Sequence, residues 1–217
     1  LSATCCCALA SAAAACAFIG AGRPVATVAQ MREAALWMLG VPDSAIVAAA
    51  TALGEAQLLR AGDGVFHLSG FTASSALGPL AGRGARSASL HPVVSFADPA
   101  RTAGVFGGSL CGLEGDAALC AELEVLVAAI GGRAFPLDAG QKPLYHAASV
   151  FASNFQVVIQ ELALKAYLQS GVPADVAATL HAGLARGALE NVLALGGAAA
   201  LAGPAARGDR SVVAHQQ

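Results

Sequence analysis

The amino-acid sequence predicts an α/β fold in which a mostly parallel sheet is followed by an all-α C-terminal part. Up to about residue 138, apolar runs of strand length alternate with stretches of helical periodicity, a pattern typical of parallel sheets covered on both faces by helices. From residue 140 onward the sequence predicts only helices. The chain has 217 residues, 56% of them hydrophobic, which is enough for a sizeable core.

The first predicted elements are a strand over 3–9 and a helix over 11–19. The helix is rich in alanine, the best helix former, and the stretch "FIGAGRPVA" follows it at residues 18–26. Gly20 and Gly22 have the first spacing of a G-x-G-x-x-G phosphate loop, but such a loop follows a strand and opens a helix. The order here is helix first, so a helix C-cap and turn is the favoured interpretation over a phosphate loop.

The next predicted elements are a short helix over 27–34 and a strand over 35–41. The strand "ALWMLGV" is continuously apolar and is stopped by Pro42, as expected for a strand buried on both faces. A helix is predicted over 44–59, with Asp43 as its N-cap.

The rest of the sheet part follows the same alternation. The helix at 116–132 begins near Asp116 and is followed by glycines, which are helix start and stop signals. The other predicted elements are strands over 64–68, 85–90, 108–115 and 133–138, and a short helical stretch over 73–81.

The C-terminal part is predicted to contain one long helix over 141–169, ended by Ser170-Gly171, and a second that runs from Pro173 to about Leu195. More helix follows "GGAAALAGP". We therefore expect a domain boundary near Ala139–Gly140, with domains over 1–139 and 140–217. The helices are apolar over most of their surface, so we expect a homodimer through residues 141–217.

Composition excludes several classes of protein. A net charge of −2 without a basic stretch argues against nucleic-acid binding. Residues 1–22 carry no charge, but they are rich in small residues that insert weakly into membranes and follow no positive segment, so neither a membrane span nor an export signal is expected. The six cysteines include no C-x-x-C pair, and the histidines lack zinc-ligand spacing, which predicts free thiols in the cytoplasm and no metal site.

Polar residues gather where three predicted strands end. Pro42-Asp43 ends the first of these strands, "HLSG" (67–70) the second and "HPVVSF" (91–96) the third. Ligands of open α/β sheets bind at the carboxyl ends of strands, so these residues are site candidates. The alternative is that they only form turns, which also favour such residue types.

The helix that begins near Gln141 carries a polar stripe. At 100° per residue, Lys142, His146, Ser149 and Ser153 lie on one narrow face, with Asn154 beside it. Lys142 and His146 are one turn apart and could supply a proton donor and an orienting group to one substrate oxygen. The alternative is a solvent-exposed face.

Several motifs appear together in a fixed order: "VPDSAI", "HLSG", "SLHPVVSF", "GLEGD", "KPLYHAASVFASNF" and "LAGPAARGD". Over nearly the whole chain they resemble the Rossmann-like oxidoreductase family whose C-terminal helical part is a domain of unknown function. That family is similar to pyrroline-5-carboxylate reductase and to the 6-phosphogluconate dehydrogenase-like group. The resemblance implies a nucleotide-binding domain, a helical dimerisation domain and NADP or NAD as cofactor.

The resemblance also assigns roles to residues. Val41, Pro42, His67 and Ser69 would line the nicotinamide side of the cofactor. His91 would lie at the floor of the site, since "HP" after a strand also resembles prephenate dehydrogenases. Lys142 and His146 would take the places of the Lys and Asn in the K-x-x-x-N pair of β-hydroxyacid dehydrogenases, with His in place of Asn. The catalytic candidates are thus His91, Lys142, His146 and Asn154. Arg207 and Asp209 would bind an anion or fix a helix start.

Family members carry G-x-G-x-x-G on their first strand and helix, and residues 3–9 correspond to the second strand. We therefore expect a Rossmann-like sheet that is N-terminally truncated, so that this chain binds NADPH or NADH weakly or not at all. The function implied is an NAD(P)-dependent oxidoreductase acting on a small oxo, imino or hydroxy acid. The alternative is a non-catalytic binding or regulatory protein that kept the fold.

Overall fold

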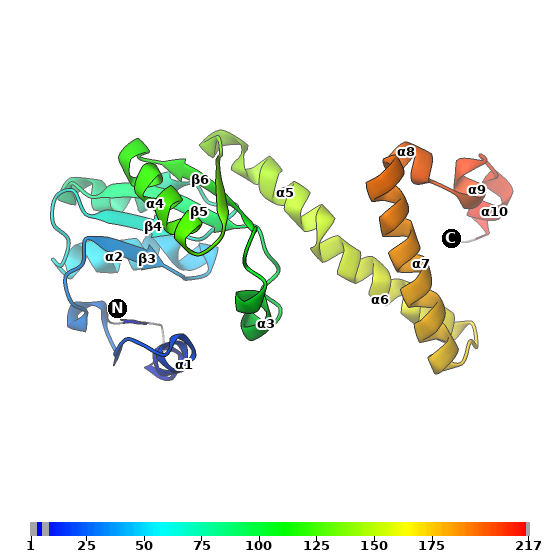
Figure 1. The fold of residues 1–217 in the computed structure, drawn as a ribbon, viewed down its shortest axis with the longest axis horizontal. Helices are drawn as coiled ribbons and strands as arrows, with labels where there is room; N and C mark the ends of the chain where they lie inside the picture. Colours follow the sequence, from blue (N-terminus) through cyan, green and yellow to red (C-terminus); the bar gives the residue numbers. More distant parts are fainter. Residues whose placement is uncertain (1–3, 6–8, 216–217) are drawn as a thin grey trace. The chain divides into compact units, whose positions relative to one another are not determined.

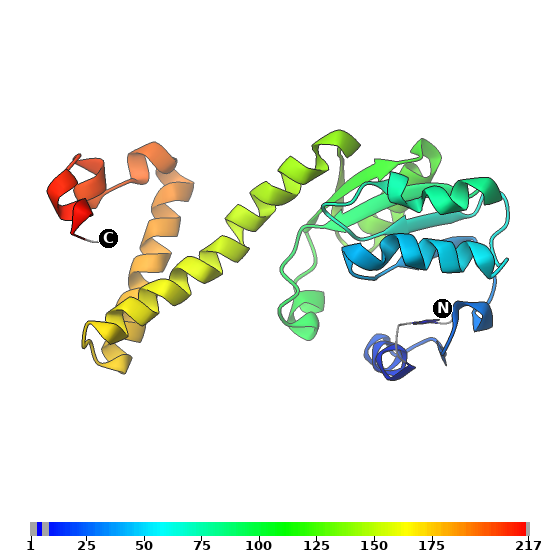
Figure 2. The same ribbon diagram turned by 180° about the vertical axis from the view of Figure 1, so that it is seen from behind.

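The computed structural model describes residues 4–5 and 9–215 of the chain (Figures 1 and 2). The chain divides into two compact units, Leu1–Ser149 and Val150–Gln217. The first unit contains the sheets and the second contains only helices.

The first unit is built on a five-stranded sheet. Three of its four strand pairings are parallel, and the pairing of β5 with β6 is antiparallel. This confirms the predicted α/β fold with a mostly parallel sheet. The strands, in their order across the sheet, are β3 (Leu36–Leu39), β4 (Gly64–His67), β5 (Arg86–Pro92), β6 (Leu110–Gly115) and β7 (Arg133–Pro136).

Helices cover both faces of this sheet (Figures 1 and 2). On one face, α2 (Ile46–Glu55) and the 3₁₀ segment η3 (Ser74–Arg83) enclose a core around Trp37 and Val65. On the other, α4 (Ala117–Ala129) packs Leu119, Leu123 and Val127 against side chains of β4, β5 and β6. Successive strand residues point to opposite faces, so each strand supplies both cores.

The strand β3 differs from the prediction that it is buried on both faces. Trp37 is 5% exposed, but its neighbour Met38 is 60% exposed. The reason is its position, because β3 is at one end of the five-strand order. An apolar run does not distinguish a central strand from an outer one.

At the N-terminus, β1 (Thr4–Cys5) pairs in parallel with β2 (Pro24–Val25), and α1 (Leu9–Ile19) lies between them in sequence. The rest of the strand predicted over 3–9 lies outside the described residues, apart from Leu9, which begins α1. Gly20 and Gly22 have φ of 74° and 97°, and the N–H groups of Gly20 and Ala21 both donate to the Cys16 carbonyl, at 2.9 and 3.2 Å. The helix C-cap interpretation of this glycine pair is thereby confirmed.

One of the two predicted acidic helix starts is correct. The Asp116 carboxylate accepts a hydrogen bond from the Leu119 N–H at 2.9 Å and caps α4. Asp43, by contrast, begins a 3₁₀ turn, η2 (Asp43–Ala45), and makes no cap to α2. Its carboxylate binds side chains that follow β4 instead. Of two further short segments, η1 (Val28–Gln30) falls within the helix predicted over 27–34, and α3 (Pro99–Gly104) was not predicted.

The helical region begins with the turn η4 (Ala139–Gln141). The long helix predicted over 141–169 is divided at Ser153, whose φ of −124° is not helical. Pro173 precedes a 22-residue helix, as predicted. The helices are α5 (Lys142–Ala152), α6 (Asn154–Gln169), α7 (Ala174–Leu195), α8 (Gly197–Ala200), α9 (Gly203–Ala206) and α10 (Arg210–Ala214).

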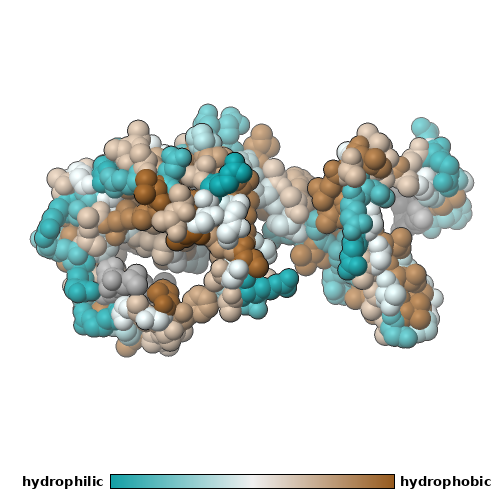
Figure 3. Space-filling view, viewed as in Figure 1, coloured by the Kyte–Doolittle hydropathy of each residue, from teal (hydrophilic) through white to brown (hydrophobic). Residues whose placement is uncertain are grey.

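The second unit leaves much apolar surface uncovered (Figure 3). Among its described side chains, Ala177 is the one that is fully buried. Residues 139–169 are also long and apolar enough for a membrane span by length and composition, since an 18-residue window within them has a mean hydropathy of 1.2. A single such stretch is a weak indication, because it rests on length and composition alone.

Candidate functional site

Three polar side chains lie in one row across the sheet. His67 of β4 pairs in register with Ser89 of β5, and Ser89 pairs with Glu114 of β6. Residues paired in register lie side by side on one face of a sheet, so the row places a histidine, a hydroxyl and a carboxylate together near the carboxyl end of β4. All three are buried.

Lys142, the first residue of α5, reaches this row and is 0% exposed. Its Nζ donates to the Ser69 carbonyl at 2.9 Å and to Ser89 Oγ at 2.5 Å, and it lies 3.6 Å from Glu114 Oε1. Burial lowers the pKa of Lys142, and the Glu114 carboxylate opposes that shift. An ammonium has three donors; two of them make hydrogen bonds here, and the charge is paired with the Glu114 carboxylate. Lys142 therefore anchors the start of α5 to the sheet.

Glu114 links the same row to η3. Its carboxylate accepts hydrogen bonds from the Ser74 N–H and the Ser74 hydroxyl, both at 2.7 Å, and it is 7% exposed. Sequence reasoning did not select Glu114, although it lies in the "GLEGD" motif. The available signal was a carboxylate inside an otherwise apolar strand, which requires a buried partner.

A turn after β4 is held by Asp43 and Ser69. Ser69 Oγ donates to Asp43 Oδ2 at 2.7 Å and accepts from the N–H groups of Phe71 and Thr72, at 3.1 and 2.7 Å. The Thr72 hydroxyl donates to the same Asp43 oxygen at 3.3 Å. Ser69, a predicted cofactor-binding residue, is therefore occupied within the protein. Ser69 therefore affects a bound ligand indirectly, by fixing the conformation of this turn.

His67 is likewise turned inward and is 0% exposed. Its Nδ1 accepts from the Ser69 N–H at 3.2 Å, which leaves Nε2 to donate to the Ala73 carbonyl at 3.2 Å. Burial is the main cause that lowers the pKa of His67, so its ring is neutral at pH 7. The other two predicted cofactor residues are more accessible, since Val41 is half-buried and Pro42 is exposed.

A second cluster joins the end of β5 to α5. His91 Nδ1 lies 2.8 Å from the Tyr145 hydroxyl, and the ring centroids of His91 and His146 are 6.2 Å apart. Phe71, from the turn after β4, lies 6.1 Å from His146. Among the described residues, none makes a hydrogen bond to His91 Nε2 or to the His146 ring. Burial, and then the neighbouring His146, lower the pKa of His91.

Two glycines make room for this cluster. A Cβ on Gly70 would lie 2.6 Å from Cε1 and 2.7 Å from Nε2 of His91, so only glycine allows the ring to lie there. Gly112 pairs with His91 in register across β5 and β6. A Cβ at Gly112 would lie 2.4 Å from Leu137 Cδ1 and 3.2 Å from the Tyr145 hydroxyl. The missing side chain of Gly70 thus makes room for the imidazole, and that of Gly112 makes room mainly for Leu137.

The remaining predicted residues bond within their own elements or are exposed. Ser149 Oγ donates to the Tyr145 carbonyl at 3.2 Å within α5. Asn154 is exposed and belongs to the second unit, where it accepts from Ser153 Oγ at 2.9 Å. Asp209 accepts from the Ser211 hydroxyl and the Val212 N–H at the start of α10, which is the predicted role of fixing a helix start. Arg207 is exposed.

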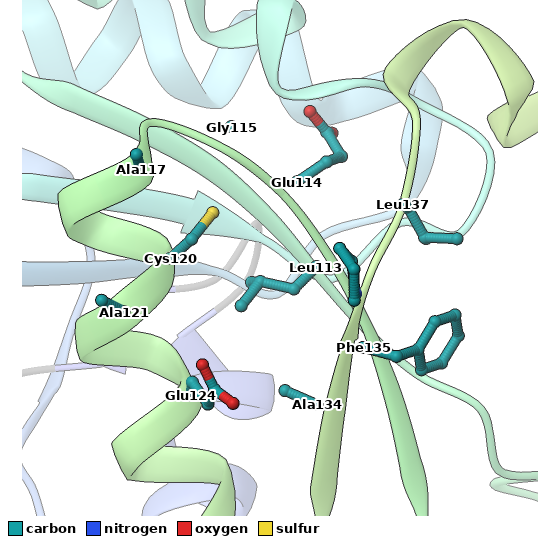
Figure 4. A pocket seen from close by; sticks show the side chains of 11 residues that line it. Leu113, Glu114, Gly115, Ala117, Cys120, Ala121, Glu124, Ala134, Phe135 and Leu137 are labelled. Atoms are coloured by element: carbon teal, nitrogen blue, oxygen red, sulfur yellow. The ribbon is translucent and has the colours of Figure 1, made fainter.

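A cavity of about 470 Å³ lies between α4 and strands β6 and β7, and Glu114 of the polar row is among the residues that line it (Figure 4). Cys120 and Glu124 line it from α4, and Phe135 and Leu137 from β7 and the residues after it. None of the predicted site residues lines this cavity. Burial raises the pKa of Cys120, so its thiol stays protonated at pH 7.

Solved structures with this fold include several oxidoreductases. Protein TM1727 from Thermotoga maritima is 25% identical, with a TM-score of 0.71 over 98% of this chain and 78% of that one. A protein described as an NADP oxidoreductase, BF3122 from Bacteroides fragilis, is 20% identical, with a TM-score of 0.78 over 100% and 80%. A pyrroline-5-carboxylate reductase from Coxiella burnetii is 15% identical, with a TM-score of 0.62 over 98% and 78%.

Among curated proteins, none matches the sequence. Residues 3–92 match the model of the Rossmann-like domain, in agreement with the parallel strands β3 to β5. Residues 109–217, half of the chain, match the model described as a domain of unknown function, DUF2520. The chain thus belongs to the DUF2520 family, with a Rossmann-like domain in front of the DUF2520 domain.

Proposed function

We propose that this chain acts as an NAD(P)-dependent oxidoreductase on a small oxo, imino or hydroxy acid. The observation that carries the proposal is the pairing of His91 and His146, 6.2 Å apart, at the end of β5. Their free ring nitrogens are suited to a small polar substrate. The names of the structurally similar NADP oxidoreductase and pyrroline-5-carboxylate reductase support the same reaction class.

The residues of the chain would contribute in different ways. Reduction of a carbonyl or imine requires a proton at the substrate oxygen or nitrogen. His91 would deliver that proton from Nε2, and His146 would hold the polar group of the substrate. Lys142 would act indirectly, because its ammonium is occupied by Ser69, Ser89 and Glu114 and fixes the helix that carries His146.

The fit of the cofactor can be judged from the described residues. When bound, a reduced nicotinamide supplies a hydride to the substrate. Val41, Pro42 and Phe71 offer apolar surface for its ring at the ends of β3 and β4. A pyrophosphate requires free N–H groups, whereas the glycines after α1 follow a helix C-terminus, where carbonyls are the free groups. The described residues therefore fit the nicotinamide end.

A titration of the 217-residue chain with NADPH and NADH tests this assignment. We expect weak binding, with a Kd far above the micromolar range. In saturation-transfer NMR the strongest signals should come from nicotinamide protons. Signals mainly from adenine protons, or submicromolar binding by calorimetry, would show that the cofactor is held elsewhere.

Turnover is tested with excess NADPH and a panel of small 2-oxo acids and cyclic imines. His91→Gln and His146→Gln should each lower kcat/KM by about 10²-fold, as for loss of a general acid, and exposed His215→Gln should not. If a small acid binds without turnover under all conditions, the alternative of a non-catalytic binding protein is the better description.

The same proposal extends to organisation and location. We place the functional division near Ala139–Gly140, with nucleotide binding before it and dimerisation after it. We also propose a cytoplasmic location, which the free thiols of Cys16, Cys111 and Cys120 support.

A further inference from the structure

The hydrogen bond between Tyr145 and His91 carries an inference that rests on the proposed function and deepens it. We propose that Tyr145 is a positioning residue that donates its phenol proton to His91 Nδ1 and so makes Nε2–H the group that protonates the substrate. The sequence offered no reason to select Tyr145. The structure places its hydroxyl 2.8 Å from His91 Nδ1.

The direction of this hydrogen bond follows from acid strength. A neutral imidazole has one N–H and one lone-pair nitrogen, and the partner of one nitrogen decides which form is present. A phenol is a stronger acid than an imidazole N–H, and an imidazole nitrogen is a stronger base than a phenol oxygen. The O–H of Tyr145 therefore donates, Nδ1 accepts, and the proton of the ring is on Nε2.

The charges around the pair keep both partners neutral. Burial lowers the pKa of His91 and raises the pKa of Tyr145. Lys142 and His146 act on His91 in the same direction as burial, and Asp43 opposes them. At neutral pH the pair is thus a phenol and an uncharged imidazole, which is the state in which the hydrogen bond selects one tautomer.

The geometry around the ring is built to keep this arrangement. His91 lies against Gly70, where a Cβ would come within 2.6 Å of the ring. Phe135 meets the Tyr145 ring edge to face, with centroids 6.2 Å apart. Both partners are therefore held by packing as well as by the hydrogen bond.

The hydrogen bond from Tyr145 also supplies a proton to His91 when His91 gives its own proton to the substrate. A neutral imidazole that lost its Nε2 proton alone would become an imidazolate, a far stronger base than a phenolate. In the pair, the Nε2–H bond breaks as a substrate O–H or N–H bond forms, and the Tyr145 O–H bond breaks as Nδ1–H forms. Nε2 then takes a proton from solvent as the Nδ1 proton returns to the Tyr145 phenolate, and this restores the pair.

Nitrogen-15 NMR of histidine-labelled full chain tests the tautomer without any substrate. In the wild type, at a pH where His91 is neutral, we expect an N–H at Nε2 and an Nδ1 signal shifted by an accepted hydrogen bond. In Tyr145→Phe the Nδ1 signal should move to the position of an unbonded nitrogen. Tyr167→Phe, the same change at the other tyrosine of the chain, should leave it unmoved. His91→Gln assigns the signals.

An Nδ1–H tautomer in the wild type overturns the proposal, and so does an unchanged Nδ1 signal in Tyr145→Phe. If the wild type turns over a substrate, Tyr145→Phe should lower kcat by about tenfold to 10²-fold with little change in KM, and an unchanged kcat also overturns it. If no substrate is turned over, the proposed function fails, but the NMR result still decides the role of Tyr145.

Discussion

Replacement of Lys142 by methionine probes how the buried ion pair anchors α5. Methionine keeps most of the length of the unbranched side chain and removes its charge. The change leaves the Glu114 carboxylate, 7% exposed, without its cation, and removes one of the two donors to the Ser69 carbonyl, which keeps the hydrogen bond from the Ser89 hydroxyl. Removing one partner of a buried pair costs about 3–5 kcal/mol. Because two hydrogen bonds from Ser74 remain on Glu114, we expect a loss at the lower end, about 3 kcal/mol.

Urea denaturation followed by circular dichroism measures this loss. Lys165→Met is the matched control, because Lys165 is 62% exposed and pairs with Glu161 one turn away on α6, an arrangement that contributes about 0.3–0.5 kcal/mol. Glu114→Gln combined with Lys142→Met should recover part of the loss, since the neutral amide no longer requires a cation. A Lys142→Met loss as small as that of Lys165→Met would refute the structural role given to the ion pair.

Three further predictions concern packing, pH and assembly. Gly70→Ala should displace the His91 ring and lower activity more than stability, as measured by turnover and thermal melting. Stability should fall as pH drops below about 6.5. The pKa values of His67 and His91 are lowered in the folded chain, so the unfolded chain binds protons first as the pH falls. Urea midpoints at two pH values check this, and His67→Gln should flatten the pH dependence of stability. Sedimentation should show a dimer. Phe151 and Leu162 are 63% and 60% exposed, and an apolar interface between two chains would cover them. A monomer at micromolar concentration contradicts this prediction.

Much of the architecture was determined by the sequence alone. Alternating apolar runs and helical stretches are local patterns, so β3 to β7, α2 and α4 could be predicted to within a few residues. The order of helix and glycines in "FIGAGRPVA" was enough to assign Gly20 and Gly22 to a C-cap. Local backbone preferences also placed Asp116 at the start of α4, because the capping bond joins residues only three apart.

The arrangement of the site was decided only by tertiary structure. His67, Ser89 and Glu114 are far apart in sequence and meet because strand register aligns them. Lys142 matches the predicted polar stripe, yet its neighbours after folding, and not its spacing, make it buried and fully paired. Tyr145 occupies an apolar-looking position on α5, and only the packing of α5 on the sheet brings its hydroxyl to His91. Periodicity describes the face of an element, whereas the partners across the sheet depend on how the strands pair.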